Sequence, residues 1–204
     1  MKWVTAILPL GFIAGNVQAA PTAGLDLFKL KVVSSVNDVD GRYLSSNAST
    51  LGLYNGDDVS PIRVYQTSSK KAGCSQLHTY PVGIVDHAIA LVGSGGLMTL
   101  TDMVNPSGAQ PADGLVTEWD SFRISDSKLT NDGKGNWVVF PTVKSGWSVK
   151  WTDGKRFRLL LSRLGRRSWT NMTVIDVGSA FMTTDYMPVE IVMEPAGEGR
   201  YNAE

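Results

Sequence analysis

Short runs of alternating apolar and polar residues recur along the chain after residue 25. Residues 28–32 read Phe-Lys-Leu-Lys-Val, so an extended strand places Phe28, Leu30 and Val32 on one face. Because period-two alternation is typical of a half-buried strand, we predict a strand here and in each similar run. The similar runs occupy residues 62–66, 121–125, 147–151 and 189–193.

Turn residues separate these runs. Residues 88–92 and 97–100 flank Gly93-Ser94-Gly95-Gly96, which predicts a hairpin, and Asn55-Gly56 is typical of a second hairpin turn. About ten to twelve short strands without a sustained helical period predict an all-β single domain, an antiparallel sandwich or barrel. A β-trefoil-like barrel is the alternative, although no sequence repeat marks a three-fold arrangement.

The beginning of the chain predicts export. Met1-Lys2 supplies a positive charge, residues 3–13 are apolar or neutral, and Val17-Gln18-Ala19 matches the small-x-small pattern of signal-peptide cleavage. We therefore interpret residues 1–19 as a signal peptide and expect the protein outside the cell or in the cell wall. Residues 20–195 are predicted to form the β-rich domain, followed by a frayed tail at 196–204.

The charge and the cysteine content limit the classes of binding partner that the sequence predicts. The chain has 19 basic and 19 acidic side chains, and only Lys2 lies in the leader, so the remainder has a net charge of −1. This balance argues against nucleic acid as a partner, and no second apolar stretch is long enough to predict a membrane span. Cys74 is the single cysteine, so we expect either a buried inert thiol or a bond to another chain.

Two tripeptides fit the acceptor pattern for N-glycosylation. They are Asn47-Ala48-Ser49, in a serine-rich turn, and Asn171-Met172-Thr173. Export would make both asparagines, Asn47 and Asn171, candidate glycan sites, which predicts that they lie at the surface.

No motif predicts a catalytic residue, a cofactor or a metal. The glycine cluster at 93–96 lacks the Lys-Ser/Thr of a phosphate-binding loop. Residues 38–41 (Asp-Val-Asp-Gly) resemble only part of a calcium loop. Cys74, His78 and His87 do not complete a four-ligand zinc set.

Acidic and aromatic residues supply the remaining candidates. Glu118 and Asp120 flank Trp119, and strand alternation would place both carboxylates on one face, an arrangement compatible with glycoside hydrolysis. Most tryptophans are expected to fill the core. Trp169, in a basic polar stretch, is the ring we expect to be exposed and to contact sugar.

One part of the chain resembles a known family. Gly108-Ala109-Gln110-Pro111, residues 122–125 (Phe-Arg-Ile-Ser) and Gly146-Trp147-Ser148-Val149 are similar to segments of the fungal phialide-type (PhiA-like) cell-wall proteins. Phe28-Lys29-Leu30 and residues 40–44 (Asp-Gly-Arg-Tyr-Leu) resemble the opening strands of that group, so the resemblance spans about residues 25–152. It implies a secreted, β-rich, wall-associated protein without catalytic activity.

The sequence thus leads to a secreted, non-enzymatic fungal cell-wall or surface protein, with cell-wall polysaccharide or a surface partner as its ligand. The alternatives are a secreted effector or carbohydrate-binding module, and a small secreted glycosidase-like enzyme that uses Glu118 or Asp120.

Overall fold

The computed structural model describes residues 24–56, 59–94, 96–109, 112–133, 135–142, 146–153, 172–177 and 180–200. Within these ranges all regular secondary structure is β-strand, which confirms the all-β prediction. The strands are β1 (Leu25–Val33), β2 (Ser45–Asn47), β3 (Thr50–Tyr54), β4 (Arg63–Ser68), β5 (Ser75–Tyr80), β6 (His87–Ser94), β7 (Leu97–Val104), β8 (Val116–Glu118), β9 (Phe122–Ser125), β10 (Lys128–Asn131), β11 (Asn136–Thr142), β12 (Gly146–Thr152), β13 (Met172–Val177), β14 (Ala180–Asp185) and β15 (Met187–Gly199). Across the described residues there is no helix with the length and apolar character needed to cross a membrane.

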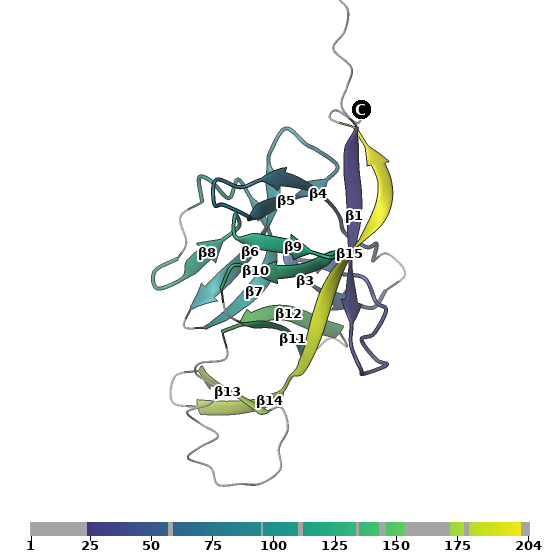
Figure 1. Cartoon of the computed structure of the whole chain (residues 1–204). Helices are drawn as coiled ribbons and strands as arrows, with labels where there is room; N and C mark the ends of the chain where they lie inside the picture. Colours follow the sequence, from purple (N-terminus) through teal and green to yellow (C-terminus); the bar gives the residue numbers. More distant parts are fainter. Residues whose placement is uncertain are drawn as a thin grey trace, which may run out of the picture.

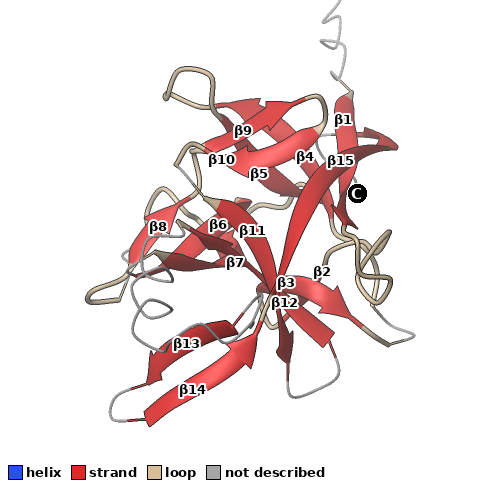
Figure 2. Ribbon diagram, turned by 60° about the horizontal axis from the view of Figure 1, so that its bottom comes forward, coloured by secondary structure: helices blue, strands red, loops and turns tan. Residues whose placement is uncertain are grey.

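Antiparallel pairing closes the main sheet on itself (Figure 1). Nine strands form a closed barrel, in the order β1, β4, β5, β6, β7, β3, β12, β11 and β15, and further strands lie outside this ring. The barrel, one of the two predicted architectures, is therefore the one observed. A separate two-stranded sheet, β13–β14, is inserted in the chain between β12 and β15 (Figure 2).

A three-fold pattern lies within this pairing. Strands β9 and β10 connect β5 to β15 and so close a shorter ring of six strands, β1, β4, β5, β9, β10 and β15. The three hairpins β2–β3, β6–β7 and β11–β12 join this ring, and their strands β3, β7 and β12 pair with one another in a cycle. A six-strand ring with three such hairpins has the topology of a β-trefoil, the alternative that we predicted.

Strand β1 serves two apolar clusters because its successive side chains point to opposite faces of the sheet. The register with β15 shifts between Leu27 and Phe28, where Ala196 is the extra residue of a bulge in β15. Leu30 and Val32 then enter the main core fully buried, with Phe28 packed beside them, as the alternation predicts. Leu27 instead packs in a second cluster with Tyr65.

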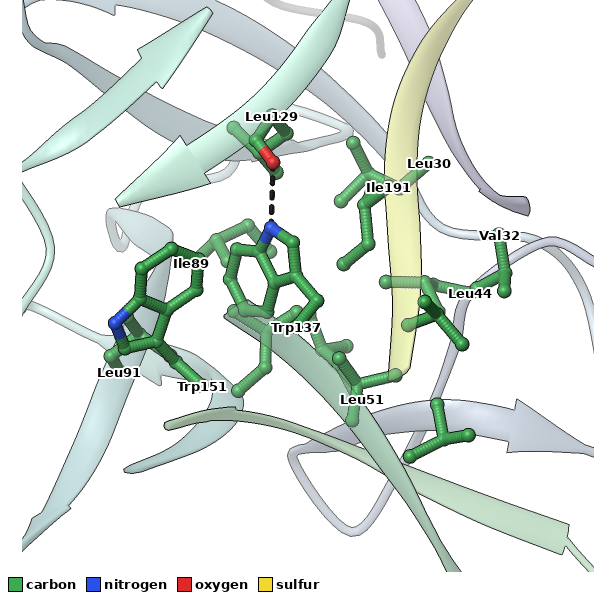
Figure 3. Packing of buried hydrophobic residues seen from close by; sticks show 14 of the residues in the cluster. Leu30, Val32, Leu44, Leu51, Ile89, Leu91, Leu129, Trp137, Trp151 and Ile191 are labelled. Carbon is green, nitrogen blue, oxygen red and sulfur yellow. Dashed lines mark hydrogen bonds between the residues drawn. The ribbon is translucent and has the colours of Figure 1, made fainter. Parts of the chain in front are cut away.

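The main core is centred on two tryptophans (Figure 3). The indole Nε1 of Trp137 donates a hydrogen bond to the backbone oxygen of Leu129 at 2.6 Å. The ring of Trp137 meets Trp151 edge to face, with 4.9 Å between centroids. Both side chains are buried, as is expected for large aromatic rings in a domain of this size. The prediction that most tryptophans fill the core therefore holds for this pair.

The hairpin predicted at Asn55-Gly56 is wrong. Strand β3 pairs with β2, β7 and β12, whereas β4, the next strand in sequence, pairs with β1 and β5. The turn that β3 does share with its predecessor is Ala48-Ser49, where φ is 47° and 67°. Tertiary pairing across the three-fold pattern overrides the local Asn-Gly signal.

The last strand is longer than the sequence suggested. β15 continues through residues 196–199, which we expected in a frayed tail, and its end pairs with the start of β1 at Leu25–Gly199. The backbone groups of these residues are satisfied by a neighbouring strand, which explains why the chain stays extended there.

Candidate functional site

The three-fold pattern places a polar residue at the same position in each repeat. Around the cycle of β3, β7 and β12, the outermost pairs are Tyr54–Gly146, Thr101–Thr50 and Thr152–Leu97. The residues that follow are Asn55, Asp102 and Asp153. The backbone N–H of Asp102 donates to the oxygen of Ser49 at 2.8 Å, and that of Asp153 donates to Gly96 at 3.0 Å, which supports their equivalence.

A pocket lies beside each of these three residues, and the pockets differ in chemistry. Asn55 borders a pocket of about 400 Å³ and accepts a hydrogen bond from Arg42 at 2.7 Å. Asp102 borders the largest, about 560 Å³, and faces His87. Asp153 borders the third, about 340 Å³. The residue that follows the outermost pair therefore borders a pocket of different chemistry in each of the three repeats.

The third pocket collects several sequence features that lie far apart in the chain, and we refer to it as the Glu118 pocket. It lies where the β6–β7 turn, β8, the end of β10 and the end of β12 meet. Its lining residues are Gly93, Ser94, Gly96, Met98, Val116, Glu118, Asn131, Gly133, Trp151 and Asp153.

The carboxylate of Glu118 is held by two neutral donors. Its Oε2 accepts a hydrogen bond from Asn131 Nδ2 at 2.7 Å and another from Ser121 Oγ at 3.3 Å. Ser121 and Asn131 are buried, with 2% and 6% of their surfaces exposed, so these donors have little freedom to move. The buried Oδ1 of Asn131 has no hydrogen-bond partner among the described groups. These two hydrogen bonds hold the Glu118 carboxylate in place at the pocket. Because an amide and a hydroxyl carry no charge, neither donor neutralises it.

Trp151 forms an apolar wall of the pocket. It is only 5% exposed and is held from behind by Trp137, so its position is rigid. A carboxylate beside a rigid indole suits ligands that have both hydroxyl or amino donors and an apolar face.

The glycine cluster at 93–96 forms the hairpin that the sequence predicted. β6 and β7 pair up to Ser94–Leu97, and Gly96 has a φ of +93°, which favours glycine. A Cβ atom on Gly93 would lie 2.4 Å from the oxygen of Leu97, and one on Gly96 would lie 2.4 Å from Asp153 Oδ1. Glycine at these positions lets the turn approach the pocket and the Asp153 side chain closely.

The structure separates the two acids that the sequence placed together. β8 ends at Glu118, so the expected alternation does not reach Asp120. Asp120 instead pairs with Lys71 at 3.1 Å, and this hydrogen bond is the main reason why the pKa of Lys71 is raised. The second carboxylate in the pocket is Asp153, which directly follows β12. Trp119 between the two acids is half-buried.

The Asp102 pocket combines a histidine with exposed apolar residues. His87 Nδ1 lies 3.5 Å from Asp102 Oδ2, and Thr79 donates to Asp102 Oδ1 at 3.2 Å. Ile84 and Val85 line the same pocket and are exposed. Ser46, Ser60 and Thr79 supply hydroxyl groups to the lining of the same pocket.

The structure does not bring the cysteine and histidines into one site. Cys74 is buried, in agreement with one of the two readings of the single thiol. His78 Nδ1 lies 2.7 Å from Asp86 Oδ1, and His87 pairs with Asp102. Over the described parts of the chain, no three His, Cys, Asp or Glu side chains are grouped as a metal would require.

The sequence-predicted surface sites fall into two groups. Asn47 is exposed at the end of β2, beside the Ala48-Ser49 turn, so its side chain is accessible. Asn171 and Trp169 lie outside the described residues.

Asn47 is therefore our site of choice for a glycosylation test. We expect that replacing Asn47 with glutamine in the protein secreted from a eukaryotic host removes one glycan, because the acceptor nitrogen is lost from an exposed turn. Intact-mass measurement before and after endoglycosidase treatment checks this. A Ser46→Ala variant leaves the acceptor tripeptide intact and serves as the control. An unchanged mass for the Asn47→Gln variant would contradict the prediction.

Comparison with known proteins gives no family for the chain. No family model, no curated protein and no solved structure matches it. The resemblance to the phialide-type wall proteins therefore stays a hypothesis, and function must be argued from the pockets themselves.

Proposed function

We propose that the protein is exported and acts, without catalysis, as a cell-wall or surface protein that binds polysaccharide in the Glu118 pocket. The leader-like residues 1–19 and the exposed acceptor at Asn47 support export. The resemblance to fungal wall proteins supports the location.

The observation that carries this proposal is the fixed carboxylate of Glu118 beside the indole of Trp151. Sugar hydroxyl groups donate hydrogen bonds to carboxylates, while the C–H face of a pyranose ring packs on apolar surface. Hydrogen bonds from Asn131 and Ser121 hold the Glu118 carboxylate in place before a ligand arrives. Binding therefore costs little conformational entropy of this side chain.

The proposal is tested by replacing Glu118 with glutamine in the mature protein. We expect affinity for the polysaccharide that it binds to fall about 10- to 100-fold, because a hydrogen bond to a charged group contributes roughly 1.5–3 kcal/mol. Co-sedimentation with insoluble wall polysaccharides, followed by titration calorimetry with soluble fragments, measures the change.

Asp120→Asn is the matched control. It also removes one negative charge, two residues away, but Asp120 lies outside the pocket and pairs with Lys71. We expect its affinity to match that of the unchanged protein. Equal urea midpoints for both variants show that the fold is kept. Absence of binding to every wall polysaccharide, or equal loss in both variants, would contradict the proposal.

A hydrolytic function is the second candidate, because Asp153 supplies another carboxylate to the same pocket. Glycosidases use two carboxyl groups, one on each side of the scissile bond. Release of new reducing ends from polysaccharide by the purified protein, lost on replacement of Glu118, would favour this candidate over a purely binding role.

A further inference from the structure

The charge in the Glu118 pocket narrows the class of ligand. The described residues that line it include two carboxylates, Glu118 and Asp153, and no lysine or arginine. The two groups that hold Glu118 are an amide and a hydroxyl, which are neutral. The pocket therefore presents negative charge from a carboxylate whose hydrogen-bond donors do not cancel it.

Two cations of the described residues, Lys71 and Arg123, form ion pairs with other acids. Lys71 lies 3.1 Å from Asp120, and Arg123 hydrogen-bonds to Asp132 at 2.6 Å. Neither Lys71 nor Arg123 lines the pocket. A ligand that carries its own positive charge would thus meet a carboxylate whose described hydrogen-bond donors are neutral. Glu118 also contributes to raising the pKa of Lys71, which lies outside the pocket.

We propose that the preferred ligand is a glycan with free amino groups, a polymer of 2-amino-2-deoxyhexose such as chitosan. This rests on the proposed function, and it specifies the substrate class of the same pocket. An ammonium group gains a charge-assisted hydrogen bond to Glu118, about twice as strong as that of a neutral donor. The small exposed part of the Trp151 indole gives the same sugar unit an apolar contact.

The N-acetylated form of the same polymer is the informative comparison. Acetylation keeps the sugar backbone and its hydroxyl groups, and it removes the charge. It also adds an acetyl group, with its carbonyl and methyl, which the pocket has to accommodate within about 340 Å³. A neutral glucan or an N-acetylated chain therefore offers the pocket only neutral donors.

The experiment compares fully deacetylated and fully N-acetylated chito-oligosaccharides of equal length. Binding to the full mature protein is measured by titration calorimetry at pH 5.5, where the amino groups are charged, with EDTA present so that metal bridging does not contribute. We expect the deacetylated oligosaccharide to bind at least about tenfold more tightly at low salt. The difference should shrink as NaCl is added, since salt screens exposed charge pairs.

Two variants show whether the preference comes from the pocket. Glu118→Gln is expected to reduce the preference to within about threefold, whereas Asp120→Asn is expected to leave it unchanged although the net charge of the two variants is the same. Equal reduction in both variants would overturn the inference, because it would assign the preference to general surface charge.

The failure of this inference differs from the failure of the proposed function. Equal binding of both oligosaccharides, or preference for the acetylated form or for a neutral glucan, overturns the amino-sugar inference and leaves polysaccharide binding in place. Absence of binding to chitosan, chitin and glucans alike overturns both.

Discussion

Replacing Trp137 with alanine is expected to lower the free energy of unfolding by about 4 kcal/mol, because truncation of a buried tryptophan removes packing and leaves a cavity. Trp137 is 3% exposed and packs edge to face on Trp151 at 4.9 Å. The change also leaves the backbone oxygen of Leu129 without the indole donor at 2.6 Å. Urea unfolding followed by circular dichroism measures the loss.

Two further variants separate the contributions. Trp137→Phe keeps an aromatic ring and removes the hydrogen bond to Leu129, so we expect an intermediate loss, about half that of the alanine variant. Trp119→Ala, at a half-buried position, is expected to cost about 1 kcal/mol. A loss below about 2 kcal/mol for Trp137→Ala would show that this ring does not organise the core.

Replacing Gly52 with alanine is expected to destabilise the protein by about 3 kcal/mol through overpacking. Gly52 lies in β3 with Ser45 of β2 on one side and Ser148 of β12 on the other. A Cβ atom there would lie 2.2 Å from the backbone oxygen of Trp147, so two paired strands would have to separate. Thermal unfolding compared with that of the unchanged protein measures the effect.

Gly108→Ala is the matched control for this change. The nearest atom to a Cβ on Gly108 is a backbone oxygen 3.9 Å away, which is ordinary van der Waals contact. We therefore expect its stability to stay within about 0.5 kcal/mol of the unchanged protein. Similar melting temperatures for the Gly52→Ala and Gly108→Ala variants would refute the close approach of β3 and β12.

The local features of the fold could be predicted because they depend on neighbouring residues. Alternation in β1 predicted that Leu30 and Val32 face the core, and both are fully buried. The glycine cluster predicted the β6–β7 hairpin, which forms. Period-two patterning and turn chemistry act over a few residues, so a single sequence contains the whole signal.

The three-fold arrangement could be predicted only as an alternative, because it depends on pairing between distant strands and no sequence repeat marks it. Asn55, Asp102 and Asp153 occupy equivalent positions, yet their sequences share only single neighbours: Thr before the two aspartates, and Gly after Asn55 and Asp153. The Asn55-Gly56 signal was misleading for the same reason, since β3 pairs with strands of the other two hairpins. Each repeat must satisfy the same backbone geometry, and different side chains can do so.

The pocket could be predicted only in part. Glu118 stood out by its place beside Trp119, but its partner Asp153 lies 35 positions away in the sequence. The two come together because the β6–β7 hairpin pairs with β8 on one side and with β12 on the other. Asp120 failed as a partner because β8 is only three residues long, so alternation beyond its end has no meaning. In a strand this short, period-two alternation cannot predict which side chains share a face beyond its end.

The pairing of β1 with β15 has a consequence for the order of events in synthesis. These strands are joined from Leu25–Gly199 to Val33–Glu190, at opposite ends of the described chain. β1 leaves the ribosome before β15, its main partner, so the ring cannot close until β15 has been made. Closure of the ring is therefore a late step in folding, because it requires pairing between two strands that are far apart in the sequence.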